Sequence, residues 1–449
     1  MNSFKFSRLV PIALVFISAL GLFLSLQAGA SVALLEKDQW KISLGGFVET
    51  DFISDSSRSF AETIGNTPVV RGDTVGRTQL SIRNSRLSFA IEAPPVEDWK
   101  SKGYFEFDLL GFDPAPGATN TEFSYFSSPT FRARHGYLQM EKNGWLLLAG
   151  QTWMLLGWQP YYFLPTAEVA PIPAMLYNRT PQFRVQKTMN LENQTDLQAA
   201  LGVMRPPQRD SNLPGFEGGL RLVVGSRTSG FVGGASSPQK TQPMSLGVSG
   251  AFREIVIPTN IADTTSPQAH FPGHALALNA LLPIVASSDG KDVGHTLTLG
   301  GEFTTGTGYG DQLNGWTGNQ ASPLNSAAAG SEKNVNLDAG IGGFNSTTGA
   351  FSLVNLQSFN AHLQYHLSAE SRTWLSAGYG ELKSNNIGSM NPAAGKVAYD
   401  KERVYFGNIM HDCTSQIRWG FEYSYTRTHY TDGAWAHNSR YQITALFLF

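Results

Sequence analysis

The sequence predicts an all-β protein, a transmembrane antiparallel β-barrel of about 16 strands with short periplasmic turns and long external loops. Three observations lead to this fold class. The C-terminal segment alternates regularly between two faces, many other segments of about ten residues alternate in the same way, and no further apolar run approaches ~18 residues after the N-terminal region. A barrel carries its apolar band in alternate positions, so moderate overall hydrophobicity is compatible with a membrane protein.

The C-terminal segment is the clearest strand. One of its faces is wholly apolar and consists of Tyr441, Ile443, Ala445, Phe447 and Phe449. The opposite face changes from apolar at Leu448 to polar at Arg440. A terminal strand that ends in phenylalanine resembles the signal by which bacterial outer-membrane barrels are recognised for assembly. The segment therefore predicts an outer-membrane location, surrounding outer-membrane lipid, and recognition of Phe449 by the barrel-assembly machinery.

Residues 1–30 have the pattern of a secretory signal peptide. Lys5 and Arg8 form a basic start, residues 9–26 are mostly apolar, and Ala28-Gly-Ala30 supplies the small residues of a cleavage site. The alternative is an N-terminal membrane anchor, because ~18 apolar residues almost span a bilayer. The helix-breaking Pro11 and the small-residue site favour cleavage, which leaves residues 31–449 as the expected barrel.

Composition excludes several classes of function. A net charge of −2 provides no basic excess for binding nucleic acid. The single cysteine, Cys413, excludes an internal disulfide and a cysteine-rich metal site, and we expect no cofactor. The 46 glycines and the 12% of aromatic residues are compatible with a soluble protein and with a barrel. Composition alone therefore does not determine the fold class, and the prediction of a barrel depends on the alternation of side chains.

Alternating segments separated by turn signals define the expected strands. They are Trp40–Phe52, Thr78–Glu92, Trp99–Phe112, Pro129–Glu141, Trp145–Met154, Leu176–Met189, Thr195–Met204, Phe216–Gly225, Ser245–Ile257, His274–Ile284, His295–Thr304, Leu356–Leu367, Thr373–Leu382, Lys401–Met410, Ser415–Arg427 and Ser439–Phe449. Long and short connections alternate, except that residues 226–244 are long where a short turn is due. A propeller would show a repeat, which is not seen, and the polar second faces suit a water-filled lumen better than the packed core of a sandwich.

On each expected strand, the face opposite the apolar face is expected to line the lumen. Between Arg83 and Arg86 the alternation slips by one residue, and a β-bulge near Asn84 would turn both arginines inward. The alternative is an arginine that extends to the membrane interface. The same test places Arg184, Arg418, Arg440, Glu106 and Asp108 inside. The phase of Arg132, Arg134 and His135 stays open, because their strand allows either one.

Residues 155–175 form an unusually apolar, aromatic and proline-rich connection, whereas most external loops are polar. We therefore expect this segment to fold into the lumen as a constriction loop or to pack on a neighbouring subunit. In the first arrangement Glu168 would lie near the loop tip opposite arginines of the wall. Charges on both sides of a narrow pore favour small charged solutes.

Several short motifs resemble the DcaP-like family of outer-membrane porins. They are Gly45-Gly-Phe47, Arg83-Asn-Ser-Arg86 followed by Leu-Ser-Phe89, Ala149-Gly-Gln-Thr-Trp153, Arg179-x-Pro-Gln-x-Arg184 and Gly420-x-Glu422-Tyr423 with Arg440. The resemblance implies a homotrimer of 16-stranded barrels that passes small anionic solutes such as dicarboxylates and aromatic acids. It also implies that Arg83, Arg86, Arg179 and Arg184 line the constriction. Some members carry an N-terminal helical segment, for which this chain has little room.

No enzymatic constellation emerges from the sequence. His362 and His366 alternate with apolar residues in a strand, and His411-Asp412-Cys413 falls in an expected turn. The chain is therefore expected not to be an enzyme. Two hypotheses are carried forward: an outer-membrane porin for passive diffusion of small anionic, carboxylate-type solutes through an arginine-lined constriction, and a non-channel barrel that serves adhesion or envelope structure through its long external loops.

Overall fold

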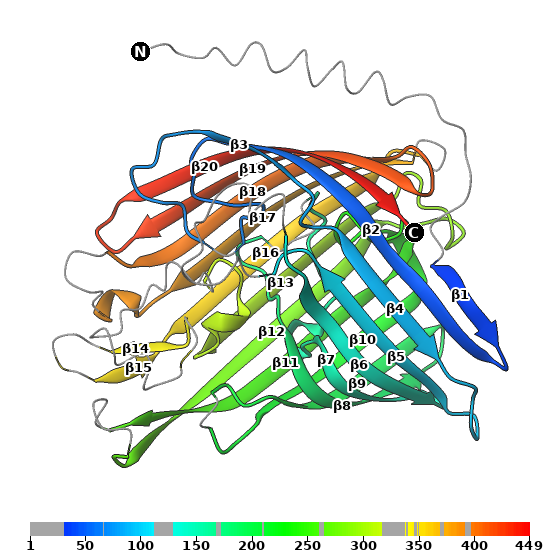
Figure 1. Cartoon of the computed structure of the whole chain (residues 1–449), viewed down its shortest axis with the longest axis horizontal. Helices are drawn as coiled ribbons and strands as arrows, with labels where there is room; N and C mark the ends of the chain where they lie inside the picture. Colours follow the sequence, from blue (N-terminus) through cyan, green and yellow to red (C-terminus); the bar gives the residue numbers. More distant parts are fainter. Residues whose placement is uncertain are drawn as a thin grey trace, which may run out of the picture.

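The chain forms a closed barrel of 16 antiparallel strands (Figure 1), as the sequence predicts. The computed structural model describes residues 31–65, 67–111, 129–167, 172–208, 211–259, 265–316, 337, 340–344, 348, 350–368, 372–390 and 397–449. The expected signal peptide, residues 1–30, and the expected loop-tip residue Glu168 lie outside the described residues.

Each expected strand has a counterpart in the barrel. The barrel strands are β2 (Trp40–Asp55), β3 (Arg77–Ser81) with β4 (Arg86–Glu92), β5 (Lys100–Asp108), β6 (Arg132–Lys142), β7 (Trp145–Trp153), β8 (Arg179–Asn190), β9 (Thr195–Met204), β10 (Gly215–Gly230), β11 (Thr241–Pro258), β12 (Gln268–Val285), β13 (Leu297–Thr307), β16 (Asn355–His366), β17 (Thr373–Ser384), β18 (Tyr399–Asp412), β19 (Ile417–Tyr430) and β20 (Trp435–Leu448). β3 and β4 share one place in the barrel, since both pair with β2.

The structure also contains short elements that the alternation does not predict. They are β1 (Val32–Lys37), β14 (Gly342–Phe344), β15 (Phe351–Leu353) and the short helices η3 (Leu156–Trp158), η4 (Gly310–Gln312) and η5 (Ile387–Ser389). β1 forms a hairpin with the start of β2, while β14 and β15 pair only with each other. No helix in the described part of the chain is long and apolar enough to cross a membrane.

The two ends of the barrel differ. β1 and the end of β20 lie at one rim, here called the terminal end, and β14, β15 and η5 lie toward the other, here called the loop end (Figure 1). The wall also varies in height: β5 to β9 contain 9 to 12 residues, whereas β10 to β12 contain 16 to 18. One side of the barrel is therefore a short wall.

Pairing of β2 with β20 closes the barrel. The last residue takes part, because the Gly46 amide donates to the Phe449 carbonyl at 2.9 Å and the Phe449 amide donates to the Gly46 carbonyl at 3.1 Å. Gly46 has a φ of +146°, and a Cβ there would lie 2.2 Å from the Arg86 carbonyl oxygen. Glycine permits this close approach of β2 and β4.

The expected bulge between Arg83 and Arg86 is confirmed by the register. Ser81 pairs with Asp51 and Arg86 with Phe47, so five steps along β3 and β4 match four along β2. The extra residue changes the phase of alternation. As a result Arg83 is buried inside the barrel and Arg86 also points inward, toward the residues described below.

Apolar side chains lie on the outside of the barrel and polar side chains on the inside, which is the reverse of a soluble protein. Phe183 and Leu201 on the outer face are 71% and 72% exposed, whereas Gln442 and Thr444 on the inner face of β20 are buried. An apolar exterior of this kind suits a surrounding of lipid, and the closed sheet leaves no unpaired edge in the hydrocarbon.

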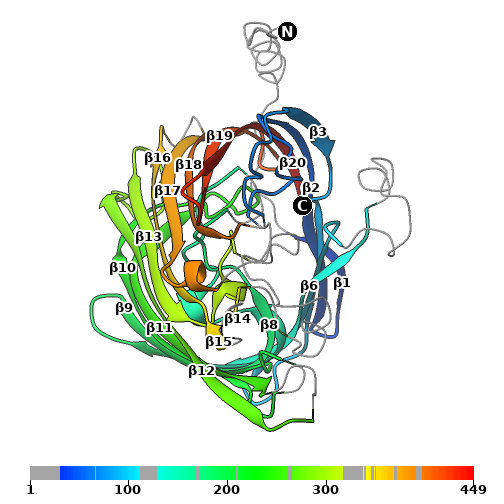
Figure 2. The same cartoon turned by 90° about the vertical axis from the view of Figure 1, so that its left-hand side faces the viewer.

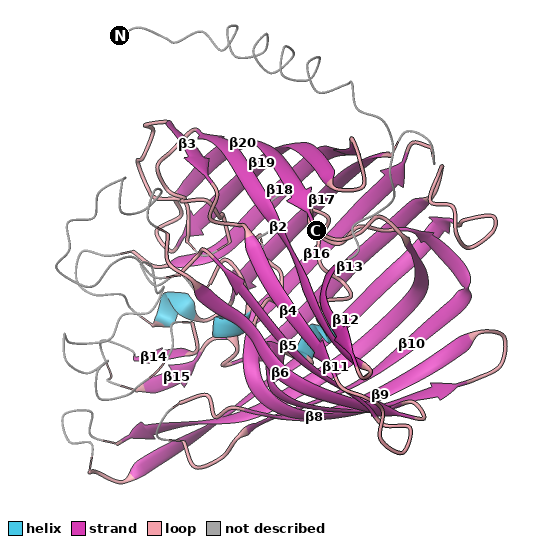
Figure 3. Ribbon diagram, turned by 45° about the vertical axis from the view of Figure 1, so that its right-hand side comes forward, coloured by secondary structure: helices cyan, strands magenta, loops and turns pink. Residues whose placement is uncertain are grey.

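Four connecting segments contribute buried residues inside the barrel. They are residues 56–76, 154–178, 231–240 and 308–316, which bring in buried side chains such as Phe60, Trp158, Phe231 and Trp316. Chain segments are seen crossing the inside of the ring of strands in Figure 2, and the short helices lie among the strands in Figure 3. The core of the molecule is thus built largely by connections. The long connection expected at residues 226–244 is shorter in the structure and comprises residues 231–240, since β10 ends at residue 230 and β11 begins at residue 241.

Candidate functional site

Residues 154–178, here called the internal loop, reach across the lumen from β7 to strands on the far wall. Glu217 on β10 accepts hydrogen bonds from the amides of Leu155 and Leu156 at 2.7 and 2.8 Å. Two further glutamates act in the same way. Glu302 on β13 accepts from the Leu176 amide at 3.1 Å, and Glu422 on β19 accepts from the Ala167 amide at 2.7 Å. These carboxylates satisfy backbone donors that have no sheet partner.

An arginine cluster lies on the short wall. It consists of Arg86 on β4, Arg132 and Arg134 on β6 and Arg179 on β8, together with Glu106 and Asp108 on β5. Arg134 Nε lies 2.5 Å from Glu106 Oε1 and Arg134 Nη1 lies 2.9 Å from Asp108 Oδ2. Arg132 Nη2 lies 2.6 Å from the same Asp108 oxygen. Among the described residues, four guanidinium groups thus face two carboxylates, which is an excess of positive charge.

A second bulge gives Arg134 and His135 their positions. Glu106 pairs with His135 and Phe107 with Ala133, which leaves Arg134 as an extra residue on β6. Both side chains are consequently buried, and His135 Nδ1 lies 3.0 Å from Thr152 Oγ1. The sequence leaves this phase open because alternation alone cannot show on which side of Arg134 the extra residue falls.

Aromatic rings surround the end of the cluster on β8. The Arg179 guanidinium lies 5.0 Å from the centre of the Trp153 ring and 5.3 Å from that of Tyr177, distances typical of cation–π contacts. Its Nη1 atom is buried and has no hydrogen-bond partner. A buried charged donor without a partner is unusual in a folded protein. Arg179 therefore has one buried donor atom for which no described group is an acceptor.

Tyr177 of the internal loop is a titratable group beside this charge. Arg134 Nη2 donates to the Tyr177 hydroxyl at 3.2 Å. Burial raises the pKa of the Tyr177 phenol, but the positive charges of Arg134, Arg179 and Arg86 outweigh burial and lower the pKa to about 7. The phenol is thus poised to lose its proton close to neutral pH.

A cavity of about 360 Å³ adjoins the cluster. It is lined by Arg86 of the wall, by Trp153, Tyr161, Phe163 and Tyr177 from β7 and the internal loop, and by residues of the 231–240 connection with Lys240. Among the described residues that line it, Arg86 and Lys240 are charged. The cavity can therefore hold a small anion against aromatic surfaces.

Three of the arginines expected to line the lumen are held in buried ion pairs. Arg83 Nη1 lies 3.1 Å from Glu62 Oε1, Arg440 Nη2 lies 2.8 Å from Asp55 Oδ2, and Arg418 Nε lies 2.5 Å from Asp412 Oδ1. Arg440 also donates to the carbonyls of Ala61 and Glu62 in the 56–76 connection. These arginines therefore hold inward segments in place, and their charge is matched locally.

The remaining expected arginine, Arg184, also faces inward but has neutral partners. It donates to Gln182 Oε1 at 2.9 Å and to the Trp153 carbonyl at 2.5 Å. Arg221 on β10 is similar and was not singled out from sequence; its guanidinium lies 3.8 Å from the centre of the Tyr161 ring. Regular alternation on β10 opposite Leu220 and Leu222 would have identified it.

The histidines and the aspartate considered for catalysis or metal binding have other contacts in the structure. In the described parts of the chain, no three His, Cys, Asp or Glu side chains are grouped so that they could hold a metal ion. His411 Nδ1 lies 2.9 Å from Thr373 Oγ1, and Asp412 is paired with Arg418. His362 stacks on Phe231 with ring centres 5.5 Å apart.

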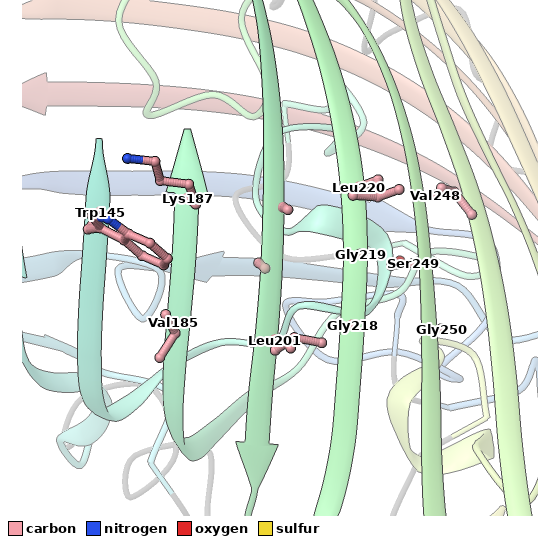
Figure 4. A pocket seen from close by; sticks show the side chains of 12 residues that line it. Trp145, Val185, Lys187, Leu201, Gly218, Gly219, Leu220, Val248, Ser249 and Gly250 are labelled. Carbon is pink, nitrogen blue, oxygen red and sulfur yellow. The ribbon is translucent and has the colours of Figure 1, made fainter. Parts of the chain in front are cut away.

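The outer face carries a separate apolar groove of about 580 Å³ on β7 to β11 (Figure 4). Gly218, Gly250 and Ala199 contribute only small side chains to it, while Leu201 and Leu220 stand beside them. At one end Lys187 Nζ lies 4.9 Å from the centre of the Trp145 ring. The groove lies next to the protruding Phe183 and Leu201 of the short wall.

Comparison with known proteins supports the fold. No family model matches the sequence, and no curated protein matches it. The structure is similar to the outer-membrane channel DcaP of Acinetobacter baumannii, with a TM-score of 0.63, 17% sequence identity and coverage of 94% of this chain and 100% of that one. It is also similar to the anion-selective porin from Comamonas acidovorans, with a TM-score of 0.51, 10% identity and coverage of 91% and 100%. The chain therefore has the fold of these outer-membrane proteins, and its closed barrel with an apolar exterior supports a location in the bacterial outer membrane.

Proposed function

We propose that the protein is a passive diffusion channel for small anionic solutes of the carboxylate type and not an enzyme. The observation that carries this proposal is the arginine cluster, in which four guanidinium groups face two carboxylates beside a cavity inside the barrel. A charged wall in a narrow, low-dielectric passage raises the local concentration of solutes of opposite charge.

The internal loop is the constriction element of this proposal. Its bonds to Glu217, Glu302 and Glu422 draw the loop toward β10, β13 and β19, away from the short wall. The cavity remains beside Arg86, where the loop contributes Tyr161, Phe163 and Tyr177. A solute would therefore pass between aromatic side chains of the loop and the arginines of the wall.

In this arrangement the expected site residues fall into two groups. Arg86, Arg179 and Arg184, with Glu106 and Asp108, set the charge beside the solute path, and Glu168 remains a candidate at the loop tip. Arg83, Arg418 and Arg440 instead position inward segments through their ion pairs. The proposal also retains residues 1–30 as a secretory signal peptide.

Neutralising the cluster should weaken anion selectivity. In the double variant Arg86→Gln/Arg179→Gln, we expect the anion-to-cation permeability ratio to fall about threefold per charge, the effect of ~0.7 kcal/mol from one charge at ~6 Å in water. The ratio is obtained from reversal potentials of the refolded protein in planar bilayers under a salt gradient. Lys187→Gln, which removes a charge from the outer face, is the control and should leave the ratio unchanged.

Wild-type protein that forms a heat-modifiable barrel but shows no conductance would contradict the channel proposal. The long external loops would then become the working surface, as in the adhesion or envelope-structure hypothesis. If the wild type conducts and the double variant has the same permeability ratio, the channel proposal stands. The arginine cluster is then not its selectivity element.

Selectivity should also depend on pH through Tyr177. The pKa of its phenol is lowered to about 7, so raising the pH from about 6 to about 8 adds a negative charge beside Arg134 and Arg179. We expect the anion-to-cation permeability ratio to decrease over this interval and Tyr177→Phe to abolish the change. His135 and the carboxylates Glu106 and Asp108 also face this position, so a pH dependence that persists in Tyr177→Phe would assign the change to one of them.

We further propose that three barrels associate through the outer face that runs from the short wall onto β10 and β11. The outer groove with Gly218 and Gly250 lies beside the protruding side chains of Phe183 and Leu201. A groove and side chains that can fill it thus lie on neighbouring parts of the same face. In the proposed trimer, the side chains of Phe183 and Leu201 of one copy insert into the groove of the next, and a rotation of one third of a turn between copies closes the ring. This surface is extensive and apolar, as subunit interfaces are.

Filling the groove should separate the subunits. In Gly250→Leu, the added side chain occupies space in the groove, and we expect the trimer measured by light scattering in detergent to shift to monomer. Ala361→Leu, between exposed Phe359 and Leu363 on β16, is the matched control on another part of the outer face. A trimer that survives Gly250→Leu unchanged would exclude this groove as the interface.

Phe449 is the proposed recognition signal for the barrel-assembly machinery. Its backbone also closes the seam with Gly46, so Phe449→Ala, which keeps that backbone pair, separates the two roles. We expect Phe449→Ala to lower the amount of heat-modifiable barrel in cell membranes but not the yield of refolding in detergent. Phe447→Ala is the control, and equal behaviour of the two variants would argue against recognition of the terminal ring.

A further inference from the structure

The connection between β10 and β11, residues 231–240, enters the barrel from the terminal end. This internal turn has the sequence Phe-Val-Gly-Gly-Ala-Ser-Ser-Pro-Gln-Lys. Its Phe231, Val232 and Ala235 are 4%, 2% and 2% exposed, although turns at a barrel rim are usually short, polar and solvated. The Phe231 amide donates to the Lys240 carbonyl at 3.2 Å, so the segment leaves and rejoins the sheet at adjacent points.

Two polar residues on other strands of the wall hold the backbone of the internal turn. Gln364 on β16 accepts from the Val232 amide at 2.7 Å and donates to the Val232 carbonyl at 3.2 Å. Arg418 on β19 donates from Nη1 to the carbonyls of Ala235 and Ser237, both at 2.6 Å. These bonds fix the turn at two points along its length, which a merely connecting turn does not need.

Arg418 is itself fixed in place. Its guanidinium forms a two-point ion pair with Asp412, with distances of 2.5 and 3.0 Å, and lies 4.7 Å from the centre of the Trp374 ring. A paired and stacked guanidinium is a rigid donor. Arg418 is therefore a positioning residue for the internal turn.

The internal turn meets the internal loop inside the barrel. Phe231 packs in one buried cluster with Leu155, Trp158 and Tyr162 of the loop. Val232 and Ala235 share a second buried cluster with Ala167 of the loop and Trp374 of the wall. Segments entering from opposite ends thus contact each other, and the cavity beside Arg86 lies between them.

We propose that the internal turn is a second selectivity element, placed in series with the internal loop. It bounds the cavity on the terminal side through Phe231, Gly233, Gly234 and Ser236, and it ends in the exposed Lys240, which also lines the cavity. A solute anion that has passed the arginine cluster is then held between Arg86 and Lys240 before it leaves the barrel. This inference rests on the proposed channel function and adds a second narrow point to it.

Three variants test the internal turn. Replacing residues 232–239 by Asn-Gly keeps the Phe231–Lys240 pair in a two-residue hairpin and should raise the single-channel conductance, because the lumen loses one of its obstructions. Lys240→Gln should lower the anion-to-cation permeability ratio about twofold, the effect of one charge at ~8 Å in water. Lys142→Gln, at the end of β6 beside a hairpin turn, is the matched control.

Arg418→Gln should also raise conductance and increase its fluctuation, since the turn loses two bonds while Lys240 keeps its charge. Arg418→Lys, which can still donate to both carbonyls, should restore part of the wild-type behaviour. If the shortened variant does not fold into a heat-modifiable barrel, Lys240→Gln and Arg418→Gln decide the question.

The outcomes separate the two proposals. An anion-selective wild-type channel whose conductance and selectivity are unaltered in Lys240→Gln and Arg418→Gln overturns the second selectivity element and leaves the channel intact. Absence of wild-type conductance overturns both. A change in Lys240→Gln that Lys142→Gln reproduces would mean a general surface-charge effect and would also overturn the role of Lys240.

Discussion

Hydrogen bonds from the polar wall to the backbone of inward segments are the interaction on which the interior depends. A closed barrel satisfies its own strands, but every segment that enters it brings amides and carbonyls without sheet partners. Glu217, Glu302 and Glu422 accept from the amides of the internal loop. Arg418 and Arg440 donate to carbonyls of residues 231–240 and 56–76. Without these partners a filled lumen of this kind would carry many unsatisfied buried groups.

The same requirement divides the charged residues by role. An arginine that faces a buried carboxylate, such as Arg83 with Glu62, contributes order and little net field. An arginine packed against rings, such as Arg179 with Trp153 and Tyr177, keeps its charge available. Charge excess therefore gathers on the short wall, although the whole chain carries a net charge of −2. Local pairing, and not overall charge, determines the field in the lumen.

The alternation of apolar and polar side chains was sufficient to predict the barrel fold, the number of strands and the change of phase between Arg83 and Arg86. These features depend on residues close together in the chain, where a period of two is visible. The positions of Arg134 and His135 were not predictable, because a bulge can be inserted on either side. The contacts of the internal turn were also hidden. Its glycines, serines and proline are those of an exposed loop, and its partner Arg418 lies 183 positions away from Ala235.

The unequal height of the wall has a consequence for the surrounding lipid. Strands of 9 to 12 residues, tilted as barrel strands are, carry a lower apolar band than strands of 16 to 18 residues in the same molecule. A bilayer next to the low side must thin or tilt its lipids to match, at an elastic cost for every ångström of mismatch. Covering that side with another protein surface removes the deformed lipid. The membrane thereby favours contact along the short wall even before any side chains of two copies have met.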